Sequence, residues 1–150
     1  MMDFIRKYID ADLNTLMDIW YKSNLEAHDF VDPSYWNKNT NFVRNAIQKA
    51  DVLVYENDGK VVGFVAMDGD YLAGLFVHRD YRSFGFGTRL IEKIKEEYDY
   101  FTLHVFKANY GAYIFYKNRG LAIRQVEINE DLGEEEYLMY YRKKKEEENE

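Results

Sequence analysis

The sequence contains no cysteine, which excludes disulfides, thiolate metal sites and a cysteine nucleophile within the chain. It has a single proline, Pro33, and nine glycines among 150 residues, and no Pro/Gly/Ser-rich linker divides it. No run approaches the roughly 20 apolar residues that a membrane helix needs. The first residues also lack the basic and apolar regions of a secretory signal. We therefore expect a cytoplasmic protein without a membrane partner.

Positive charge is in short supply, with 20 basic against 27 acidic residues and a net charge of −7. This balance disfavours broad nucleic-acid binding. Apolar residues make up 47% of the chain, which is enough to build a core at this length. We expect one domain over residues 1–141 and a charged, flexible tail over residues 142–150. The sequence does not set the oligomeric state, and a homodimer stays open.

Apolar periodicity and turn signals divide the chain into strands and helices. Strands are expected over residues 4–9, 52–55, 61–67, 71–77, 101–106, 121–128 and 136–141. Helices are expected over residues 10–27, 33–50, 88–98 and 109–119, with Asp10 as the cap of the first. The order β-α-α-β-β-β-α-β-α-β-β predicts a mixed α/β sheet with antiparallel hairpins, not a series of βαβ units.

A glycine-rich loop stands between an expected strand and an expected helix. It reads Arg82-Ser83-Phe84-Gly85-Phe86-Gly87. Glycines let the backbone approach a ligand, and the following helix start presents free N–H groups to an anion. The loop differs from a Walker A loop, because Thr88-Arg89 follows it, and from a dinucleotide fingerprint, because Leu90 replaces the third glycine. A plain turn would use the same glycines, so the loop alone does not establish a phosphate site.

A second motif opens the expected helix over residues 109–119. It consists of Asn109, Ala112, Tyr113 and Tyr116. Their offsets of 0, 3, 4 and 7 place an amide, a small side chain and two phenols on one helical face. Taken alone, this pattern also fits an amphipathic helix packed on a core.

The two motifs, in this order, resemble the acyl-CoA site of the GNAT family of N-acetyltransferases, in its small single-domain bacterial form. The likeness is densest over residues 71–121, and the expected element order extends it over residues 3–141. It implies the GNAT fold, acetyl-CoA as co-substrate without a metal, and direct acetyl transfer to a primary amine in a ternary complex. Arg79, Ser83 and Leu121 stand where the family often has proline, glycine and phenylalanine, and none of these differences removes a functional group.

The resemblance also implies which residues bind the co-substrate. They are Leu75, Phe76, Val77, Arg82, Ser83, Phe84, Gly85, Phe86, Gly87, Thr88, Asn109, Ala112 and Tyr113. The strand before the loop would splay from its neighbour, with Gly74 permitting a bulge, and its backbone would bind the pantetheine arm and polarise the thioester. The loop would hold the pyrophosphate, and Asn109 would contact the pantetheine. Tyr116 would protonate the departing CoA thiolate.

His104 is the candidate base, since it stands where some family members carry a glutamate. Alternation along the strand puts it on one face with Thr102 and Phe106. A histidine there could take the proton of the acceptor amine directly or through water. A histidine that only shapes the pocket through hydrogen bonds fits the sequence equally well.

The acceptor side is expected in the segment over residues 10–32, which holds six carboxylates and one lysine. Carboxylates and aromatic rings suit a cationic amine, although a solvated acidic helix has the same composition. The candidate contacts are Trp20, Glu26, His28 and Phe30. A polyamine-like molecule, an amino acid, an aminoglycoside and a lysine side chain all remain open as acceptors.

Two other functions fit the same residues. A CoA-binding sensor or interaction module could keep this fold without turnover, although a mere binder needs no phenol at position 116. Transfer of a longer acyl group would use an apolar pocket, for which Phe76, Phe84 and Phe86 are candidates.

Overall fold

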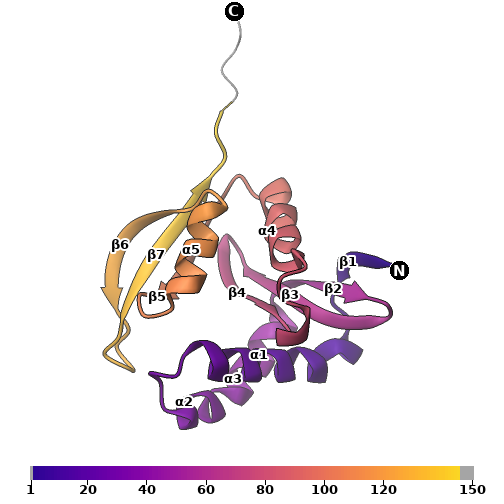
Figure 1. Cartoon of the computed structure of the whole chain (residues 1–150), viewed down its shortest axis with the longest axis horizontal. Coiled ribbons are helices and arrows are strands. Elements are labelled where there is room, and N and C mark those ends of the chain that lie inside the picture. The colour runs from indigo at the N-terminus through magenta and orange to yellow at the C-terminus, as the bar shows by residue number, and fades with distance from the viewer. Residues whose placement is uncertain (1, 146–150) are drawn as a thin grey trace, which may run out of the picture.

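The computed structural model describes residues 2–145 and is built on one seven-stranded sheet (Figure 1). The strands are β1 (Asp3–Lys7), β2 (Asp51–Asn57), β3 (Lys60–Asp68), β4 (Tyr71–Val77), β5 (Tyr100–Phe106), β6 (Ala122–Ile128) and β7 (Glu135–Arg142). Their order in the sheet is β1-β2-β3-β4-β5-β7-β6. All neighbours are antiparallel except β4 and β5, which are parallel. The expected mixed α/β sheet is thus confirmed.

Helices cover the two faces of the sheet (Figure 1). They are α1 (Leu13–Ala27), α2 (Pro33–Lys38), α3 (Thr40–Lys49), α4 (Phe86–Glu97) and α5 (Tyr110–Asn118). Strand β3 is buried on both sides because its residues alternate between two cores. Val65 and Met67 pack with α4 and α5, whereas Phe64 and Ala66 pack with α1, α2 and α3. Within residues 2–145, no helix is both long enough and apolar enough to cross a membrane.

Two expected helices have different limits in the structure. The helix expected over residues 33–50 is broken at Asn39, which ends α2 and begins α3. The Asn39 side chain donates to the Tyr35 carbonyl oxygen at 2.7 Å, and this local bond competes with a continuous helix. Helix α4 begins at Phe86, two residues before the expected start at residue 88, because Gly85 adopts the left-handed conformation that precedes the first turn.

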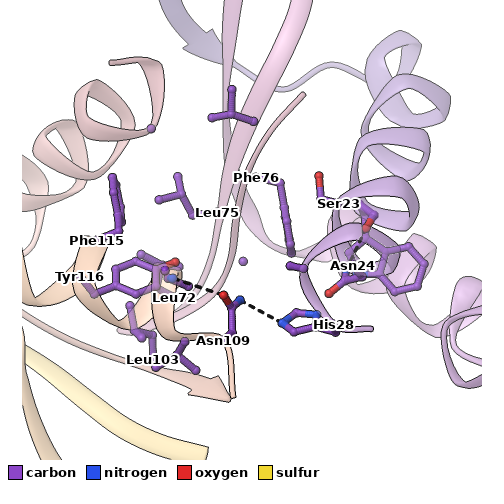
Figure 2. A pocket seen from close by; sticks show the side chains of 18 of the residues that line it. Ser23, Asn24, His28, Leu72, Leu75, Phe76, Leu103, Asn109, Phe115 and Tyr116 are labelled. Atoms are coloured by element: carbon purple, nitrogen blue, oxygen red, sulfur yellow. Dashed lines mark hydrogen bonds between the residues drawn. The ribbon is translucent and has the colours of Figure 1, made fainter. Parts of the chain in front are cut away.

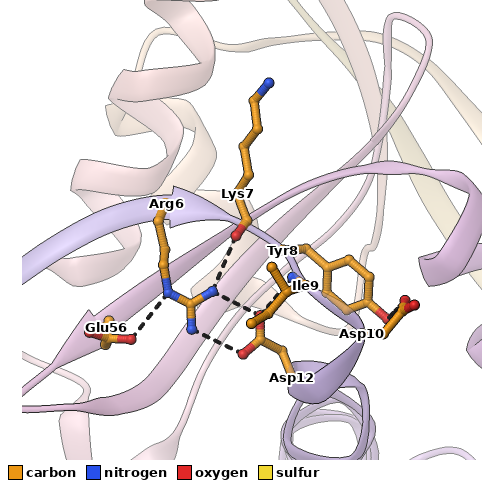
Figure 3. Close-up of polar contacts among 7 residues, drawn as sticks. All are labelled: Arg6, Lys7, Tyr8, Ile9, Asp10, Asp12 and Glu56. Atoms are coloured by element: carbon orange, nitrogen blue, oxygen red, sulfur yellow. Dashed lines mark hydrogen bonds and ion pairs between the residues drawn. The ribbon is translucent and has the colours of Figure 1, made fainter.

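The start of α1 is organised by Asp12, so the expectation that Asp10 caps this helix is wrong. A 3-10 turn over Asp10–Asp12 precedes α1. The Asp12 carboxylate accepts the Ile9 backbone N–H at 2.9 Å and a bidentate pair of bonds from Arg6 at 2.9 and 3.0 Å (Figure 3). Arg6 also donates to Glu56 on β2 at 3.1 Å. This cluster attaches the start of α1 to β1 and β2.

Strands β4 and β5 separate soon after they meet. Within the described residues, Tyr71 and Thr102 form their one pair in register. The pairing of β4 with β3 is irregular at the same level. Gly74 stands opposite Ala66 and Leu72 opposite Met67, so Ala73 has no partner on β3 and bulges from β4. The splay and the bulge implied by the family resemblance are therefore both present.

The C-terminal strand runs one residue further than expected, to Arg142, which the sequence had placed at the start of the charged tail. Of that tail, residues 146–150 lie outside the described residues.

Candidate active site

A cavity of about 870 Å³ lies where β4 and β5 separate (Figure 2). This is the size of a site for a cofactor or a drug-sized ligand. Residues 72–77 of β4 and 103–106 of β5 line it, together with parts of α1, α4 and α5. The side chains of Ser23, Asn24 and His28 border it from the α1 side, and those of Phe115 and Tyr116 border it from α5 (Figure 2).

The edge of β4 supplies backbone groups to this cavity. After Tyr71, no described residue of β5 pairs with β4, so Leu75, Phe76 and Val77 line the cavity beside an unpaired strand edge. Free N–H and C=O groups on such an edge can bind an extended ligand that carries amides. Gly74 suits this shape, because a Cβ there would stand 2.6 Å from the Phe76 ring and force that ring to move.

The glycine loop forms one end of the cavity and precedes α4. Ser83 and Gly85 have φ angles of 78° and 81°, which turn the chain sharply into the helix. The first backbone bond of the helix runs from the Arg89 N–H to the Gly85 carbonyl oxygen at 3.0 Å. The preceding N–H groups, including that of Gly87, therefore have no acceptor within the helix and can bind an anion.

Most of the expected loop residues line the cavity. They are Arg82, Ser83, Gly85, Phe86, Gly87 and Thr88. Phe84 does not, since 62% of it is exposed to solvent outside the cavity. Arg119, at the end of α5, also lines the cavity and donates to the Thr88 hydroxyl at 3.1 Å. Sequence reasoning missed this second guanidinium, because only the packing of α5 beside α4 brings it to the loop.

Arg82 connects the glycine loop to α1. Its guanidinium contacts the Glu26 carboxylate at 3.0 Å and the Ser23 hydroxyl at 3.4 Å, and its Nε donates to the Val77 carbonyl oxygen at 3.1 Å. Glu26, expected on the acceptor side, does not line the large cavity and is held by this ion pair instead. An incoming pyrophosphate would compete with Glu26 for Arg82.

Asn109 spans the cavity toward α1. Its Oδ1 accepts the Ala112 backbone N–H at 3.3 Å and so caps α5, while its Nδ2 lies 3.1 Å from His28 Nε2 (Figure 2). Because an amide nitrogen is a donor, His28 Nε2 is the unprotonated nitrogen of a neutral ring. Burial lowers the pKa of His28 to about 4, so the ring is neutral at neutral pH. The second hydrogen on Asn109 Nδ2 is available to a ligand.

Aromatic rings hold His28 in place. It stacks on Trp36 with ring centroids 5.5 Å apart and meets Phe30 and Phe106 edge-on at 5.6 and 5.0 Å. Of the expected acceptor residues, Trp20 and His28 line the cavity, whereas Phe30 packs behind the His28 ring and does not line it. Trp36, Phe106 and Glu136 line the same region from three separate elements. The sequence places Trp36 just beyond the acceptor segment and Phe106 on the strand face of His104, but it gave no sign of Glu136.

Tyr116 projects from α5 into the cavity (Figure 2). Only 9% of it is exposed, and its hydroxyl makes no hydrogen bond with another residue in the range 2–145. Burial raises its pKa, and Tyr71 adds a smaller electrostatic contribution in the same direction. The phenol is therefore protonated and available as a donor at neutral pH. Ala112 also lines the cavity, but Tyr113 packs on Tyr137 outside it.

His104 lines the cavity from β5, and both of its ring nitrogens have partners. The Tyr71 hydroxyl is 2.7 Å from Nδ1, and the Glu127 carboxylate oxygens are 3.1 and 3.3 Å from Nε2. Sequence reasoning found the histidine but neither partner. Tyr71 reaches it because β4 and β5 are still adjacent at that level, and Glu127 reaches it across β7 from β6.

The splayed strands, the free N–H groups at the start of α4 and the facing phenol define an acyltransferase that takes its acyl group from coenzyme A. Comparison with known proteins agrees. The acetyltransferase (GNAT) domain family matches residues 48–120. The chain is 31% identical over 121 residues to the peptidyl-lysine N-acetyltransferase YiaC of Escherichia coli K12, which covers 79% of this chain and 83% of that protein. The chain belongs to the GNAT acetyltransferase family.

Solved structures show the same fold. The apo form of YjaB from Escherichia coli superposes with a TM-score of 0.84 at 25% identity, covering 96% of this chain and all of that one (100%). The PaiA N-acetyltransferase of Thermoplasma acidophilum in complex with coenzyme A has a TM-score of 0.74 at 21% identity, over 95% of this chain and 99% of that one. The chain is accordingly an N-acetyltransferase, and acetyl-CoA is its acetyl donor.

Proposed function

We propose that this chain acetylates the side-chain amine of lysine residues in proteins or peptides. The main support is its similarity to YiaC, a peptidyl-lysine N-acetyltransferase, at 31% identity over most of both chains. YjaB of Escherichia coli K12 carries the same name and is 29% identical over 134 residues, 89% of this chain and 91% of that protein.

The acceptor end of the cavity has the chemistry that a lysine side chain requires. Trp20 and Trp36 line it and offer flat apolar surface to the aliphatic stem. Glu136 also lines it and has no ion-pair partner within the described residues. A carboxylate there attracts the ammonium group before it is deprotonated.

The co-substrate would lie along β4 and the glycine loop. The backbone of Leu75, Phe76 and Val77 would bind the pantetheine arm and polarise the thioester carbonyl, with Asn109 contributing its free amide hydrogen. The N–H groups at the start of α4, with Arg82 and Arg119 beside them, would bind the pyrophosphate.

The transfer removes two protons from the acceptor ammonium and supplies one to the leaving sulfur. The ammonium loses its first proton to His104, the neutral nitrogen attacks the thioester carbon, and the carbon–sulfur bond breaks as Tyr116 protonates the departing thiolate. The second proton leaves the new amide nitrogen and restores the Tyr116 phenol. No covalent enzyme intermediate is formed, because the nucleophile is the acceptor nitrogen itself.

The proposal is tested with purified protein, acetyl-CoA and a panel of amines. The panel contains a peptide with one lysine and a blocked N-terminus, a peptide with a free N-terminus and no lysine, free lysine, a polyamine and an aminoglycoside. We expect thiol release and a mass increase located on the lysine of the first peptide. Faster turnover of any other amine contradicts the lysine assignment, and binding of acetyl-CoA without turnover of any amine indicates a sensor.

Two expectations from the sequence stand as proposals beside this one. The single domain over residues 1–141 is supported by a sheet that is continuous from β1 to β6, and limited proteolysis should leave that range intact. The cytoplasmic location is tested by cell fractionation.

A further inference from the structure

The two ring nitrogens of His104 have chemically different partners, and this decides where each proton lies. Glu127 is a carboxylate whose pKa is lowered, first by its hydrogen bond from His104. An ionised carboxylate can only accept, so Nε2, 3.1 Å away, must carry a hydrogen. In the neutral ring Nδ1 is then the unprotonated nitrogen, and it accepts the hydroxyl hydrogen of Tyr71 at 2.7 Å.

This arrangement leaves His104 one site for an incoming proton. Nε2 is already protonated and directed at Glu127, while Nδ1 is covered by the Tyr71 hydroxyl. The hydrogen bond from Tyr71 offers a direct route by which a proton from the acceptor ammonium reaches Nδ1.

We propose that Tyr71 is a catalytic residue that relays the proton of the acceptor amine to His104, and that Glu127 is the positioning residue that holds the ring ready to receive it. The acceptor ammonium transfers one proton to the Tyr71 oxygen, directly or through one water, as the Tyr71 hydroxyl proton moves to Nδ1 of His104. The products are a neutral amine, a neutral phenol and an imidazolium facing Glu127. This relay rests on the proposed function, in which His104 is the base.

The surrounding charges favour a relay over a stable phenolate. The carboxylates that act on Tyr71 are Glu136 from β7 and Glu127 from β6, which stand opposite each other in register, and Glu127 also contacts His104. Burial first, and then these two carboxylates, raise the pKa of Tyr71 to about 12. The Glu127 carboxylate, 3.1 Å from Nε2, would face the imidazolium directly. Tyr71 therefore passes a proton on without remaining ionised, and the charge comes to rest on His104.

The position of Tyr71 suits this role. It is the residue at which β4 and β5 are last in register, directly before Leu72 and the bulged Ala73, which both line the cavity. His104 and Tyr116 both line the cavity, so the final acceptor of the amine proton and the group that protonates the thiolate stand at one site.

The first test is the pH dependence of kcat for Tyr71→Phe, which keeps the ring and removes the relay oxygen. We expect kcat at neutral pH to fall about 100-fold, the limb with a histidine-like ionisation to disappear, and the loss to shrink at high pH as the amine deprotonates in solvent. Without the Tyr71 hydroxyl, Nδ1 of His104 is free to take the proton itself. An unchanged kcat with the same pH limb in Tyr71→Phe would therefore overturn the relay. Tyr100→Phe, at a half-buried strand tyrosine whose hydroxyl accepts from Arg124, is the matched control.

The second test separates the positioning role of Glu127 from a structural one. Glu127→Gln removes the charge that favours the imidazolium, so the histidine limb should move to lower pH while kcat falls. Glu135→Gln, a neighbouring carboxylate paired with Lys107, should leave the limb in place. If the histidine limb of Glu127→Gln stays at the wild-type pH, as expected for Glu135→Gln, Glu127 does not position His104 for the relay.

The tautomer of His104 is a readout that needs no acceptor. Nitrogen-15 NMR of the labelled chain, with His104→Gln used for assignment, should show the proton on Nε2. A proton on Nδ1 overturns the relay whatever amine is acetylated. Conversely, if His104→Gln keeps the wild-type pH limb, His104 is not the base. The base assignment in the proposed function and the relay through Tyr71 are then both overturned. Acetyl-CoA should still raise the melting temperature of every variant, which verifies that each is folded.

Discussion

Asn109 illustrates how one side chain at this site does several tasks. It caps α5, donates across the cavity to His28 and keeps one amide hydrogen free. The arrangement works only while His28 is neutral, because a protonated ring would present an N–H to the amide hydrogens of Asn109. The buried position of His28 among three aromatic rings keeps the ring neutral.

The low pKa of His28 predicts a stability that depends on pH. The folded protein keeps this ring neutral down to about pH 4, whereas the unfolded chain protonates it near pH 6.5. The unfolded state binds more protons in that window, so the free energy of unfolding falls as pH decreases from about 6.5 to about 4. Urea unfolding at pH 7 and pH 4.5 should show the wild type losing roughly 2 kcal/mol more than His28→Gln, after allowance for partial exposure. Equal losses would contradict the assignment.

Tyr116 predicts a separation of catalysis from binding. Tyr116→Phe keeps the ring and removes only the proton donor, so kcat should fall by about 10²–10⁴-fold while the affinity for acetyl-CoA changes little. Tyr113→Phe, on the same helix but outside the cavity, is the control and should retain wild-type kcat. Turnover is measured by thiol release under conditions where chemistry limits the rate. An unchanged kcat would remove Tyr116 from the mechanism.

At the scale of elements, α1 is attached at both ends to parts of the molecule distant in sequence. Its start is held by Asp12 and Arg6, and near its end Glu26 holds Arg82 of the glycine loop. The wall that faces the acceptor is thereby tied to the loop assigned to the co-substrate. The sequence showed the helix through its apolar spacing, but the ion pairs join residues that local patterns do not connect.

Asp12 predicts a specific loss of stability. Asp12→Asn leaves the Arg6 charge without its bidentate partner and weakens the bond to the Ile9 N–H, so the free energy of unfolding should fall by about 2 kcal/mol. The pKa of Asp12 is lowered, first by the hydrogen bond from Arg6. Its contribution is therefore complete above about pH 4 and is lost as pH falls through the lower, folded-state pKa.

The control for this prediction is Asp10→Asn, because the exposed Asp10 carboxylate accepts, among residues 2–145, only a 3.3 Å bond from the Tyr8 hydroxyl. Urea unfolding at pH 7 should separate the two variants, and below pH 3 the difference between them should narrow. Equal stabilities at pH 7 would show that the Arg6–Asp12 pair contributes nothing.

At the scale of the whole molecule, the cavity exists because one sheet opens between β4 and β5. The half with β1–β4 carries the glycine loop. The half with β5–β7 carries His104 on β5 and Tyr116 on α5, the helix that follows β5. A co-substrate in this opening contacts both halves of the sheet. Its binding therefore stabilises the association of the two halves.

Acetyl-CoA should therefore stabilise the native state by binding to it. At a hundred times its dissociation constant it should add about 2.7 kcal/mol to the free energy of unfolding, which is measured as a higher melting temperature. Gly87→Asp should abolish the shift by placing a carboxylate against the pyrophosphate. The site has room for a side chain, since a Cβ on Gly87 would meet Phe115 at an ordinary 3.6 Å. Gly87→Asn has the same shape without the charge and should keep part of the shift. If Gly87→Asp binds CoA normally, the loop does not hold the phosphates.

Much of the fold and part of the site followed from the sequence. Helix and strand identities follow from apolar spacing over a few residues, and the glycine loop and the Asn109 motif marked the co-substrate side because backbone conformation and capping are local. The limits at Asn39 and Phe86 were misjudged, since a side-chain hydrogen bond in one case and a positive φ in the other decide where a helix begins.

The sequence by itself determined the order of elements, the family and the position of the candidate acid and base. Only the tertiary structure decided what surrounds them. His104 gains Tyr71 from 33 residues earlier and Glu127 from 23 residues later, because β4 touches β5 at one level and β7 brings β6 within reach. Contacts of this kind depend on the register and order of strands, which are set by packing of the whole sheet and leave no mark in the local pattern of residues.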